Sequence, residues 1–326
     1  MSTYVAHGVI ANVFTAFNED LSLDDDGQRH FLDFVLANNA NSAFFVRSGM
    51  GQMYTYNYDE VKQITRTACK HLAGKAPVVV GSTGIWDQNF DALPDPAVFT
   101  RQAVELSKYA QDQGAAAVVH TLPEAIRPRA GETEADVILR YFETISDAVS
   151  VPIMIYQPPA MSKPYCVTVD LIRKLADMPK VHAIKVSTGD AGYILDLTWA
   201  VRGKDFVFIS GNECAFFAGL CSGAKAVIGQ GACVNPQILK AVQDRFDAGD
   251  IDGAMDAQRS TNLLVYEAVN PVEFLKRYAT ENGHPVKPYR RPTFSASYGE
   301  YQQPNLSDAD YTRYKAVLER ELAKYR

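Results

Sequence analysis

The sequence lacks the long apolar runs and the excess of positive charge that would tie it to a membrane or to nucleic acid. No apolar run approaches the ~20 residues needed to span a bilayer. The formal net charge is −6, and the basic residues are spread along the 326-residue chain. Residues 1–17 contain no lysine or arginine ahead of an apolar segment. These absences predict a cytoplasmic protein that binds small molecules and has no nucleic-acid or membrane partner.

Cysteine and histidine are also scarce, and neither shows metal-binding spacing. The five cysteines include no C-x-x-C pair, and the six histidines form neither H-x-H nor H-E-x-x-H. A disulfide framework, a cysteine zinc site and a histidine metal site therefore have no support in the sequence. We expect the cysteines to be reduced core thiols, and we expect no metal and no cofactor.

Short apolar segments rich in β-branched residues recur at fairly even intervals along the chain. They are residues 8–14, 42–46, 77–81, 116–121, 152–156, 181–186, 206–210 and 226–229. Segments with helical spacing of apolar residues separate them, and such alternation is typical of a parallel sheet. No G-x-G-x-x-G turn follows the first strand, which disfavours an open dinucleotide-binding sheet. The fold class is therefore predicted as α/β, a (β/α)₈ TIM barrel.

The chain beyond the eighth strand predicts additional helices. Residues 236–282 read as helical, residues 283–304 as a long surface connection, and Ser307 as the cap of a last helix. We interpret residues 1–235 as the barrel and residues 236–326 as a C-terminal helical extension packed on it, so that the two form one structural unit.

The sixth strand carries a lysine at its carboxyl end, where barrels of this kind place their active sites. Strict alternation along V-H-A-I-K puts Val181, Ala183 and Lys185 on the face that points into the barrel. Removal of the amine from water favours its neutral form, which can attack a ketone. The alternative is a lysine that reaches solvent from the strand end.

The fifth strand ends on a tyrosine. In V-P-I-M-I-Y, Tyr156 shares the inward face with Met154. Because neighbouring strands lie ~4.8 Å apart, its phenol can reach a carbon attached to the Lys185 nitrogen and transfer protons there. The alternative is a buried structural tyrosine whose hydroxyl has a partner.

A loop with two glycines, R-S-G-M-G-Q, follows the second strand at residues 47–52. It precedes a helix for which Asn57 and Glu60 form a cap. Backbone N–H groups in such a turn can hold a carboxylate. The alternative is an ordinary connection between a strand and a helix.

In this order, the motifs resemble those of the dihydrodipicolinate synthase and N-acetylneuraminate lyase family, which are Schiff-base-forming, class I aldolase-type barrels. The family motif G-T-T-G-E corresponds to residues 48–52, and Y-x-x-P corresponds to residues 156–159. Lys185 follows Tyr156 by 29 positions (185 − 156). The segments S-T-G-D, S-G-N-E and G-A-K-A-V-I-G, which begin at residues 187, 210 and 223, also fit. The resemblance covers the chain to about residue 292.

The resemblance implies roles for individual residues. Lys185 is expected to form the Schiff base, with Tyr156 as its partner in proton transfer. The residues expected to bind the substrate are Ser48, Gly49, Met50, Gly51, Gly211 and Ile228. Schiff-base chemistry needs no metal, because the protonated imine is itself the electron sink. Similar barrels are commonly tetramers or dimers, so we expect a homo-oligomer.

The chain departs from the family pattern at the positions whose hydroxyl groups take part in proton transfer in the family. Gly49 and Met50 replace two loop threonines, and Glu124 and Ala125 replace a tyrosine pair. Met161 stands in place of the arginine that marks dihydrodipicolinate synthases, from which we infer that the protein is not one of these synthases. Glu124 is a candidate general acid or base, and the alternative is a surface carboxylate.

The resulting hypothesis is a lyase that forms a Schiff base with a 2-oxo acid. It covers an aldolase that releases pyruvate and a dehydratase of a 2-keto-3-deoxy sugar acid, which differ only in the bond that breaks after imine formation. The alternatives are a deaminase or hydratase of the same family, and a non-catalytic barrel that binds a small acid. Retention of Lys185 and Tyr156 favours an enzyme over the binding protein.

Overall fold

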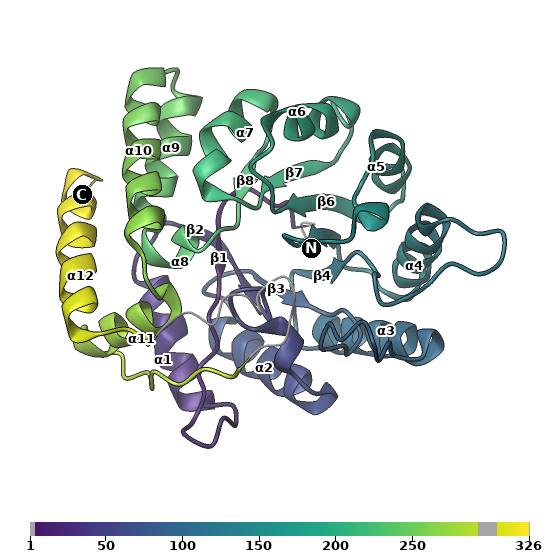
Figure 1. The fold of residues 1–326 in the computed structure, drawn as a ribbon, viewed down its shortest axis with the longest axis horizontal. Helices are drawn as coiled ribbons and strands as arrows, with labels where there is room; N and C mark the ends of the chain where they lie inside the picture. Colours follow the sequence, from purple (N-terminus) through teal and green to yellow (C-terminus); the bar gives the residue numbers. More distant parts are fainter. Residues whose placement is uncertain (1–3, 293–304, 326) are drawn as a thin grey trace.

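The computed structural model describes residues 4–292 and 305–325, and it shows a closed barrel of eight parallel strands (Figure 1). The strands are β1 (Gly8–Asn12), β2 (Asn41–Val46), β3 (Val78–Gly81), β4 (Ala117–Thr121), β5 (Ile153–Gln157), β6 (Val181–Val186), β7 (Val207–Ser210) and β8 (Ala226–Val227). Each strand pairs with its neighbours in the sequence, and β8 pairs with β1 to close the barrel. The predicted TIM barrel is confirmed.

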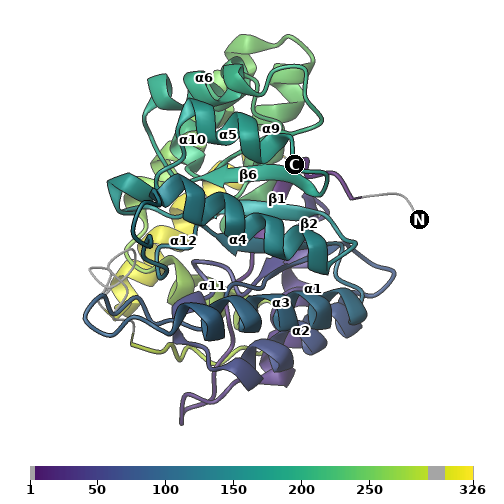
Figure 2. The same cartoon turned by 90° about the vertical axis from the view of Figure 1, so that its right-hand side faces the viewer.

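Helices alternate with the strands and cover the outside of the barrel, as the side view of α3, α4 and α5 shows (Figure 2). The helices are α1 (Asp25–Leu36), α2 (Tyr58–Leu72), α3 (Pro96–Asp112), α4 (Glu134–Ala148), α5 (Val169–Ala176), α6 (Ala191–Ala200), α7 (Phe216–Ser222), α8 (Gly231–Val234), α9 (Pro236–Asp247), α10 (Ile251–Glu267), α11 (Pro271–Glu281) and α12 (Asp308–Leu322). Short 3₁₀ turns are η1 (Met53–Thr55), η2 (Lys163–Tyr165), η3 (Glu213–Ala215) and η4 (Ala323–Tyr325). The predicted caps are present, since Asn57 and Glu60 form a capping box on α2 and Ser307 caps α12.

The side chains of the strands alternate between the barrel interior and the layer beneath the helices. Met154, Tyr156 and Ala183 belong to the interior cluster, as the alternation predicts. Val181 packs instead in the outer cluster, so its predicted inward position is wrong. The reason is a register shift, because Ile153 pairs with Val181 and the next residue, Met154, pairs with Ala183. The alternation starts afresh after this shift and brings Lys185 to the inner side.

The five cysteines are free thiols, but they do not all belong to the core. Cys69 and Cys233 are buried, whereas Cys221, near the end of α7, is exposed, so the expected core position is wrong for it. In the part of the chain that the structure describes, no helix is long and apolar enough to cross a membrane. The same residues contain no cluster of three or more His, Cys, Asp or Glu side chains that could hold a metal ion.

The C-terminal helices extend the barrel on one side (Figure 1). Helix α9 packs against α7 and α10, α11 packs against α1, and α12 packs against α10. The division into a barrel over residues 1–235 and an extension over residues 236–326 remains our interpretation of the chain. Residues 293–304 of the predicted long connection lie outside the described residues.

The residues that follow α11, 284–292, form a segment that we call the strap, which runs from α11 past α1 towards α2 (Figure 1). Its Arg291 donates hydrogen bonds to both carboxylate oxygens of Glu60, at 2.5 and 2.9 Å. The buried Lys276 of α11 donates to the carbonyl oxygen of Tyr289 at 2.5 Å. The strap is therefore fastened to the body of the barrel at both of these points.

Lys276 makes stability dependent on pH. Burial and the nearby Arg290 lower the pKa of its amine to about 7, against the smaller opposing effects of Glu273 and Asp24. The unfolded chain has a lysine pKa of ~10.4, so between pH 7 and pH 10 it binds more protons than the folded chain. We therefore expect the free energy of unfolding to rise between pH 7 and pH 9.5, by up to about 3 kcal/mol from this one group.

Urea unfolding of the wild-type protein and of a Lys276→Met variant at the two pH values measures this rise. Other groups that titrate in the same range act on both proteins, so the difference between the two isolates Lys276. An equal rise in the variant would contradict the assignment.

Candidate active site

A cavity of about 330 Å³ opens at the carboxyl ends of the strands. Its lining includes Asn12, Gly49, Met50, Tyr156, Lys185, Gly211, Glu213, Ile228 and Arg290. These residues come from strand ends and from the connections that follow them, together with the strap. The position is where barrels of this kind place their reacting groups.

Lys185 and Tyr156 lie side by side across the β5–β6 pairing. The Lys185 Nζ atom is 4.1 Å from the centroid of the Tyr156 ring, so the amine lies over the ring face. Lys185 is 3% exposed and Tyr156 is 1% exposed, so the lysine does not reach open solvent. The Phe45 ring packs edge-on against Tyr156, at 6.4 Å between centroids, and helps to fix the phenol ring.

The loop after β2 divides into residues that face the cavity and residues that hold the turn. Gly49 and Met50 line the cavity. The Ser48 hydroxyl donates to the Val13 carbonyl and accepts from the Gly51 N–H, both at 3.0 Å, so it fixes the turn. A Cβ on Gly51 would lie 2.6 Å from the Val13 oxygen, which leaves room for glycine alone.

The backbone of this loop offers two donors to a ligand. Within residues 4–292 and 305–325, the N–H groups of Gly49 and Met50 donate to no protein acceptor. Adjacent N–H groups in a turn can together bind an anion. The loop is thus suited to hold a carboxylate without the threonine hydroxyls that the family pattern supplies.

Glu213 is a cavity residue that the sequence analysis did not single out. It begins η3, which follows β7 after Gly211 and Asn212, and it belongs to the segment S-G-N-E. Its Oε1 atom accepts from the Gly231 N–H at 3.1 Å, and burial raises the pKa of its carboxyl group. The signal in the sequence that could have identified Glu213 is an acidic residue shortly after the end of a barrel strand. Gly211 and Ile228, which the resemblance implied, line the same cavity.

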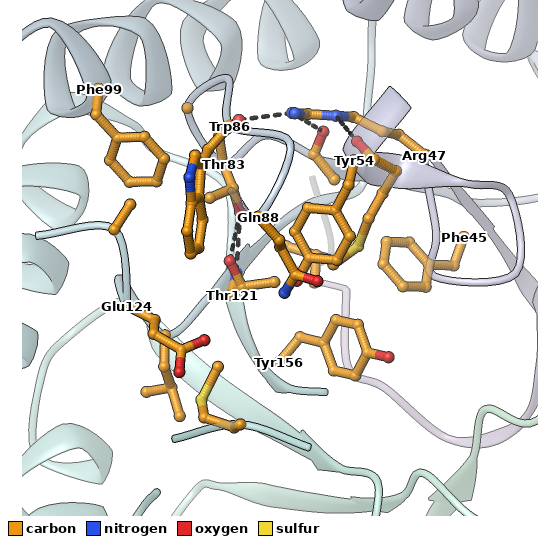
Figure 3. Close-up of a pocket in the computed structure, with 17 residues that line it drawn as sticks. Phe45, Arg47, Tyr54, Thr83, Trp86, Gln88, Phe99, Thr121, Glu124 and Tyr156 are labelled. Atoms are coloured by element: carbon orange, nitrogen blue, oxygen red, sulfur yellow. Dashed lines mark hydrogen bonds between the residues drawn. The ribbon is translucent and has the colours of Figure 1, made fainter. Parts of the chain in front are cut away.

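Glu124 lines a second, smaller chamber together with Trp86, Tyr54 and Tyr156 (Figure 3). It is 3% exposed, and its Oε1 atom accepts from the Ser162 N–H at 2.7 Å and from the Ser162 hydroxyl. Burial raises the pKa of its carboxyl group. Glu124 is therefore no surface carboxylate, but it does not share the cavity of Lys185.

Tyr156 connects the two spaces. Among the described residues it is the one side chain that lines both the cavity and the chamber. In Figure 3 its phenol oxygen points away from the Glu124 carboxyl group, so the tyrosine ring, rather than its hydroxyl, faces that carboxyl group. Proton transfer between the two groups would therefore need an intervening water or side chain.

The chamber is built around a buried arginine. The Arg47 guanidinium donates to the carbonyl oxygens of Thr83, Gly81 and Met53, at 2.6, 3.3 and 3.4 Å (Figure 3). Burial lowers its pKa to about 10. The chamber has a volume of about 20 Å³, enough for about one water molecule. Met161, at the position of the family arginine, lines this chamber and not the Lys185 cavity.

A sequence profile of the Dihydrodipicolinate synthetase family matches residues 5–307. The chain belongs to this family. The match spans the barrel and the helices α9 to α11, so every strand end described above lies within it. The resemblance inferred from the motifs is confirmed.

Relatives in this family carry different activities in their names. The 4-hydroxy-tetrahydrodipicolinate synthase of Nitrosospira multiformis is 26% identical, over 83% of this chain and 85% of its own length. The putative 2-dehydro-3-deoxy-D-gluconate aldolase YagE of Escherichia coli K12 is also 26% identical, over 88% and 91%. A relative named as a synthase and a relative named as an aldolase are thus equally identical to this chain, so sequence identity does not distinguish between the two activities.

Two solved structures show the same fold. YagE in complex with pyruvate matches with a TM-score of 0.78 at 22% identity, covering 98% of this chain and 99% of the other. N-acetylneuraminate lyase from Mycoplasma synoviae matches with a TM-score of 0.76 at 19% identity, covering 97% of each. The chain therefore has the fold of a family of lyases, and its own activity must be argued from its site.

The Glu213 carboxyl group depends on a glycine in the family segment G-A-K-A-V-I-G. A Cβ added to Gly229 would lie 1.9 Å from Glu213 Oε2. We expect Gly229→Ala to displace the carboxyl group and to cost about 1–3 kcal/mol of stability, the usual range for overpacking. A crystal structure of the variant and its urea unfolding measure both effects.

Gly192→Ala, in the first turn of α6, provides the matched control, because its Cβ would meet no atom closer than 3.4 Å. An unmoved Glu213 side chain and unchanged stability in Gly229→Ala would refute the packing argument.

Proposed function

We propose that this protein is a lyase that forms a Schiff base between Lys185 and a 2-oxo acid. The observation that carries the proposal is the buried Lys185 amine, which lines a cavity large enough for a small acid and lies 4.1 Å from the centre of the Tyr156 ring. The relatives support it, since YagE is named as a putative aldolase and was solved with pyruvate. A homo-oligomer also remains part of the proposal.

The first half of the reaction uses three groups of the cavity. The N–H groups of Gly49 and Met50 bind the C1 carboxylate of the substrate. The neutral amine of Lys185 attacks the C2 carbonyl carbon to form a carbinolamine. Tyr156 delivers a proton to the carbinolamine hydroxyl, which leaves as water, and the C–N bond becomes an iminium. The iminium then withdraws electrons from C3.

The second half depends on which group meets the C3–C4 end of the substrate. In a dehydration, the Tyr156 phenolate left by imine formation accepts the C3 proton, and Glu213 protonates the 4-hydroxyl group, which leaves as water. In a retro-aldol cleavage, Tyr156 accepts the proton of the 4-hydroxyl group while the C3–C4 bond breaks and its electron pair moves to the iminium. The raised pKa of Glu213 favours dehydration, because the carboxyl group keeps a proton to donate.

The position of Met161 bears on the synthase reaction. This residue stands where the family pattern of dihydrodipicolinate synthases has an arginine, and it lines the second chamber rather than the cavity. No guanidinium at that position can therefore meet a substrate carboxylate. We infer that the protein does not catalyse the synthase reaction.

Borohydride trapping tests the imine. We expect incubation with pyruvate and borohydride to add a stable adduct to the peptide that contains Lys185, as measured by intact mass and peptide mapping. The adduct should be absent in Lys185→Ala and unchanged in Lys174→Ala, a matched change of a lysine in α5. An adduct that persists in Lys185→Ala, or none with pyruvate and longer 2-oxo acids, would leave the non-catalytic binding protein as the better hypothesis.

The pH profile of turnover tests which carboxyl group acts as the acid. The pKa of both Glu213 and Glu124 is raised by burial, so each holds its proton to a higher pH than an exposed glutamate. If Glu213 donates a proton to the leaving group, turnover should fall as pH rises through its pKa. We expect Glu213→Gln to remove this alkaline fall and to lower turnover by about 10²-fold or more.

Glu124→Gln is the matched comparison, and we expect it to keep the alkaline fall. If Glu124→Gln removes the fall and Glu213→Gln does not, the acid is Glu124, as the sequence first suggested.

A further inference from the structure

Asn12, the last residue of β1, places an amide in the lining of the Lys185 cavity. Ile10, two positions earlier, belongs to the interior cluster, so alternation along the strand also turns the Asn12 side chain into the barrel. The residue is 3% exposed. Asparagine is disfavoured in strands, and burial of its amide costs free energy unless the amide is hydrogen-bonded. The strand itself therefore gives no reason for an amide at this position.

The Asn12 amide has no hydrogen-bond partner among the described residues. Within residues 4–292 and 305–325, its Oδ1 atom accepts from no donor and its Nδ2 atom donates to no acceptor. Most buried polar groups in proteins are hydrogen-bonded, so an unpartnered amide in a cavity wall needs an explanation, and a ligand supplies one. The amide can turn about its Cβ–Cγ bond, because that torsion has broad minima, so either atom can reach the cavity.

Asn212, a second asparagine of the same lining, serves the fold instead. Its Oδ1 atom accepts from the Cys214 N–H at 3.0 Å and caps the turn η3. The two asparagines thus differ in that the Asn212 oxygen already has a donor within the protein.

The strand order places Asn12 between two parts of the site. Strand β1 lies between β2 and β8, so Asn12 lies between the loop after β2 and the end of β8. At the end of β8, Gly229 lies against the Glu213 carboxyl group. On the other side, Asn12 pairs with Phe45, whose ring packs against Tyr156. The amide therefore belongs to the ring of strand ends that surrounds the proposed reaction.

The chemistry of an amide selects the ligand group. The Asn12 oxygen only accepts hydrogen bonds, so it needs a donor, and a carboxylate or ketone oxygen cannot supply one. A hydroxyl group both donates and accepts, so it can satisfy either atom of the amide. An ammonium group would need a carboxylate beside it. Glu213 is the acidic residue of the lining among the described residues, and burial raises its pKa, which favours its neutral form.

We propose that Asn12 binds the 4-hydroxyl group of the substrate and so selects 4-hydroxy-2-oxo acids. The inference rests on the proposed function, which assigns the C1 carboxylate to the N–H groups of Gly49 and Met50 and the C2 carbon to Lys185. The hydroxyl group donates its hydrogen to Asn12 Oδ1 and keeps its lone pairs for the proton of Glu213. An acid without this hydroxyl group leaves the amide unpaired in the closed cavity.

Calorimetric binding of three matched acids tests the proposal. 2-Oxopentanoate, 4-hydroxy-2-oxopentanoate and 5-hydroxy-2-oxopentanoate have equal chain lengths and differ in one hydroxyl group or its position. The measurements use Lys185→Met, whose unbranched side chain has no amine and forms no imine. We expect this protein to bind the 4-hydroxy acid about tenfold more tightly than the other two acids. Asn12→Leu in the same background should abolish this preference and leave the affinity for 2-oxopentanoate nearly unchanged.

The stability of the ligand-free protein gives a second readout. Leucine has the same branching of side-chain heavy atoms as asparagine and carries no polar group, so Asn12→Leu removes an unpaired amide. We expect urea unfolding to give an unchanged or higher free energy of unfolding for this variant. Asn212→Leu is the matched comparison, and we expect it to lower stability, because it leaves the Cys214 N–H without its cap.

Equal affinities for the three acids in Lys185→Met would overturn the proposal, because the amide would then bind water only. A tighter binding of the 5-hydroxy acid would also overturn it, since the hydroxyl group that meets Asn12 would lie one carbon further along the chain. An equal loss of affinity for all three acids in Asn12→Leu would mean that Asn12 binds the C1 carboxylate or the ketone. A marked loss of stability in ligand-free Asn12→Leu would mean that the amide supports the fold.

The two proposals fail in different ways. Calorimetry in Lys185→Met tests Asn12 without Schiff-base chemistry, whereas borohydride trapping with pyruvate tests the imine with an acid that has no 4-hydroxyl group. An adduct on Lys185 without any preference for the 4-hydroxy acid would keep the lyase and refute the role of Asn12. A preference that depends on Asn12, without any adduct on Lys185, would support the hydroxyl site and refute the lyase.

Discussion

The burial of the Lys185 amine is the constraint around which the site is organised. The Lys185 side chain is 3% exposed inside the closed barrel, so its amine is held away from open solvent. The Nζ atom lies 4.1 Å from the centroid of the Tyr156 ring, and the pairing of β5 with β6 fixes the amine over that face. A substrate that turns the amine into an iminium keeps a cation over the same ring.

The other groups reach this amine because the barrel is closed. Eight parallel strands bring their carboxyl ends to one rim, so residues far apart in the sequence, such as Gly49, Lys185 and Glu213, line one cavity. The close approaches require small residues in fixed places. Gly229 makes room for the Glu213 carboxyl group, and Gly51 lets the loop lie against the Val13 carbonyl. Both glycines are needed because a larger side chain would not fit there, and neither takes part in the reaction.

The sequence predicts the parts of this arrangement that leave a regular pattern of apolar residues or a fixed spacing between motif residues. Alternating apolar segments predict all eight strands, and the spacing of Tyr156 and Lys185 predicts neighbours on β5 and β6. The alternation fails at Val181, because a register shift leaves no trace in the pattern. The sequence does not identify Glu213 as a cavity residue, because the turn η3, and not the alternation along a strand, determines where its side chain points. The strap is beyond the reach of local patterns, since Gln52 and Arg291 are separated by 239 positions.

The loop after β2 shows how a change of side chains transfers a possible role to the backbone. Gly49 and Met50 carry no hydroxyl group, so an anion that enters the cavity at this loop meets two backbone N–H groups instead. The Ser48 hydroxyl does not replace the lost hydroxyl groups, because it already holds the turn through the Val13 carbonyl and the Gly51 N–H. Two backbone donors bind one anion only while they point at it together, so the fixed turn is what makes the loop suited to an anion.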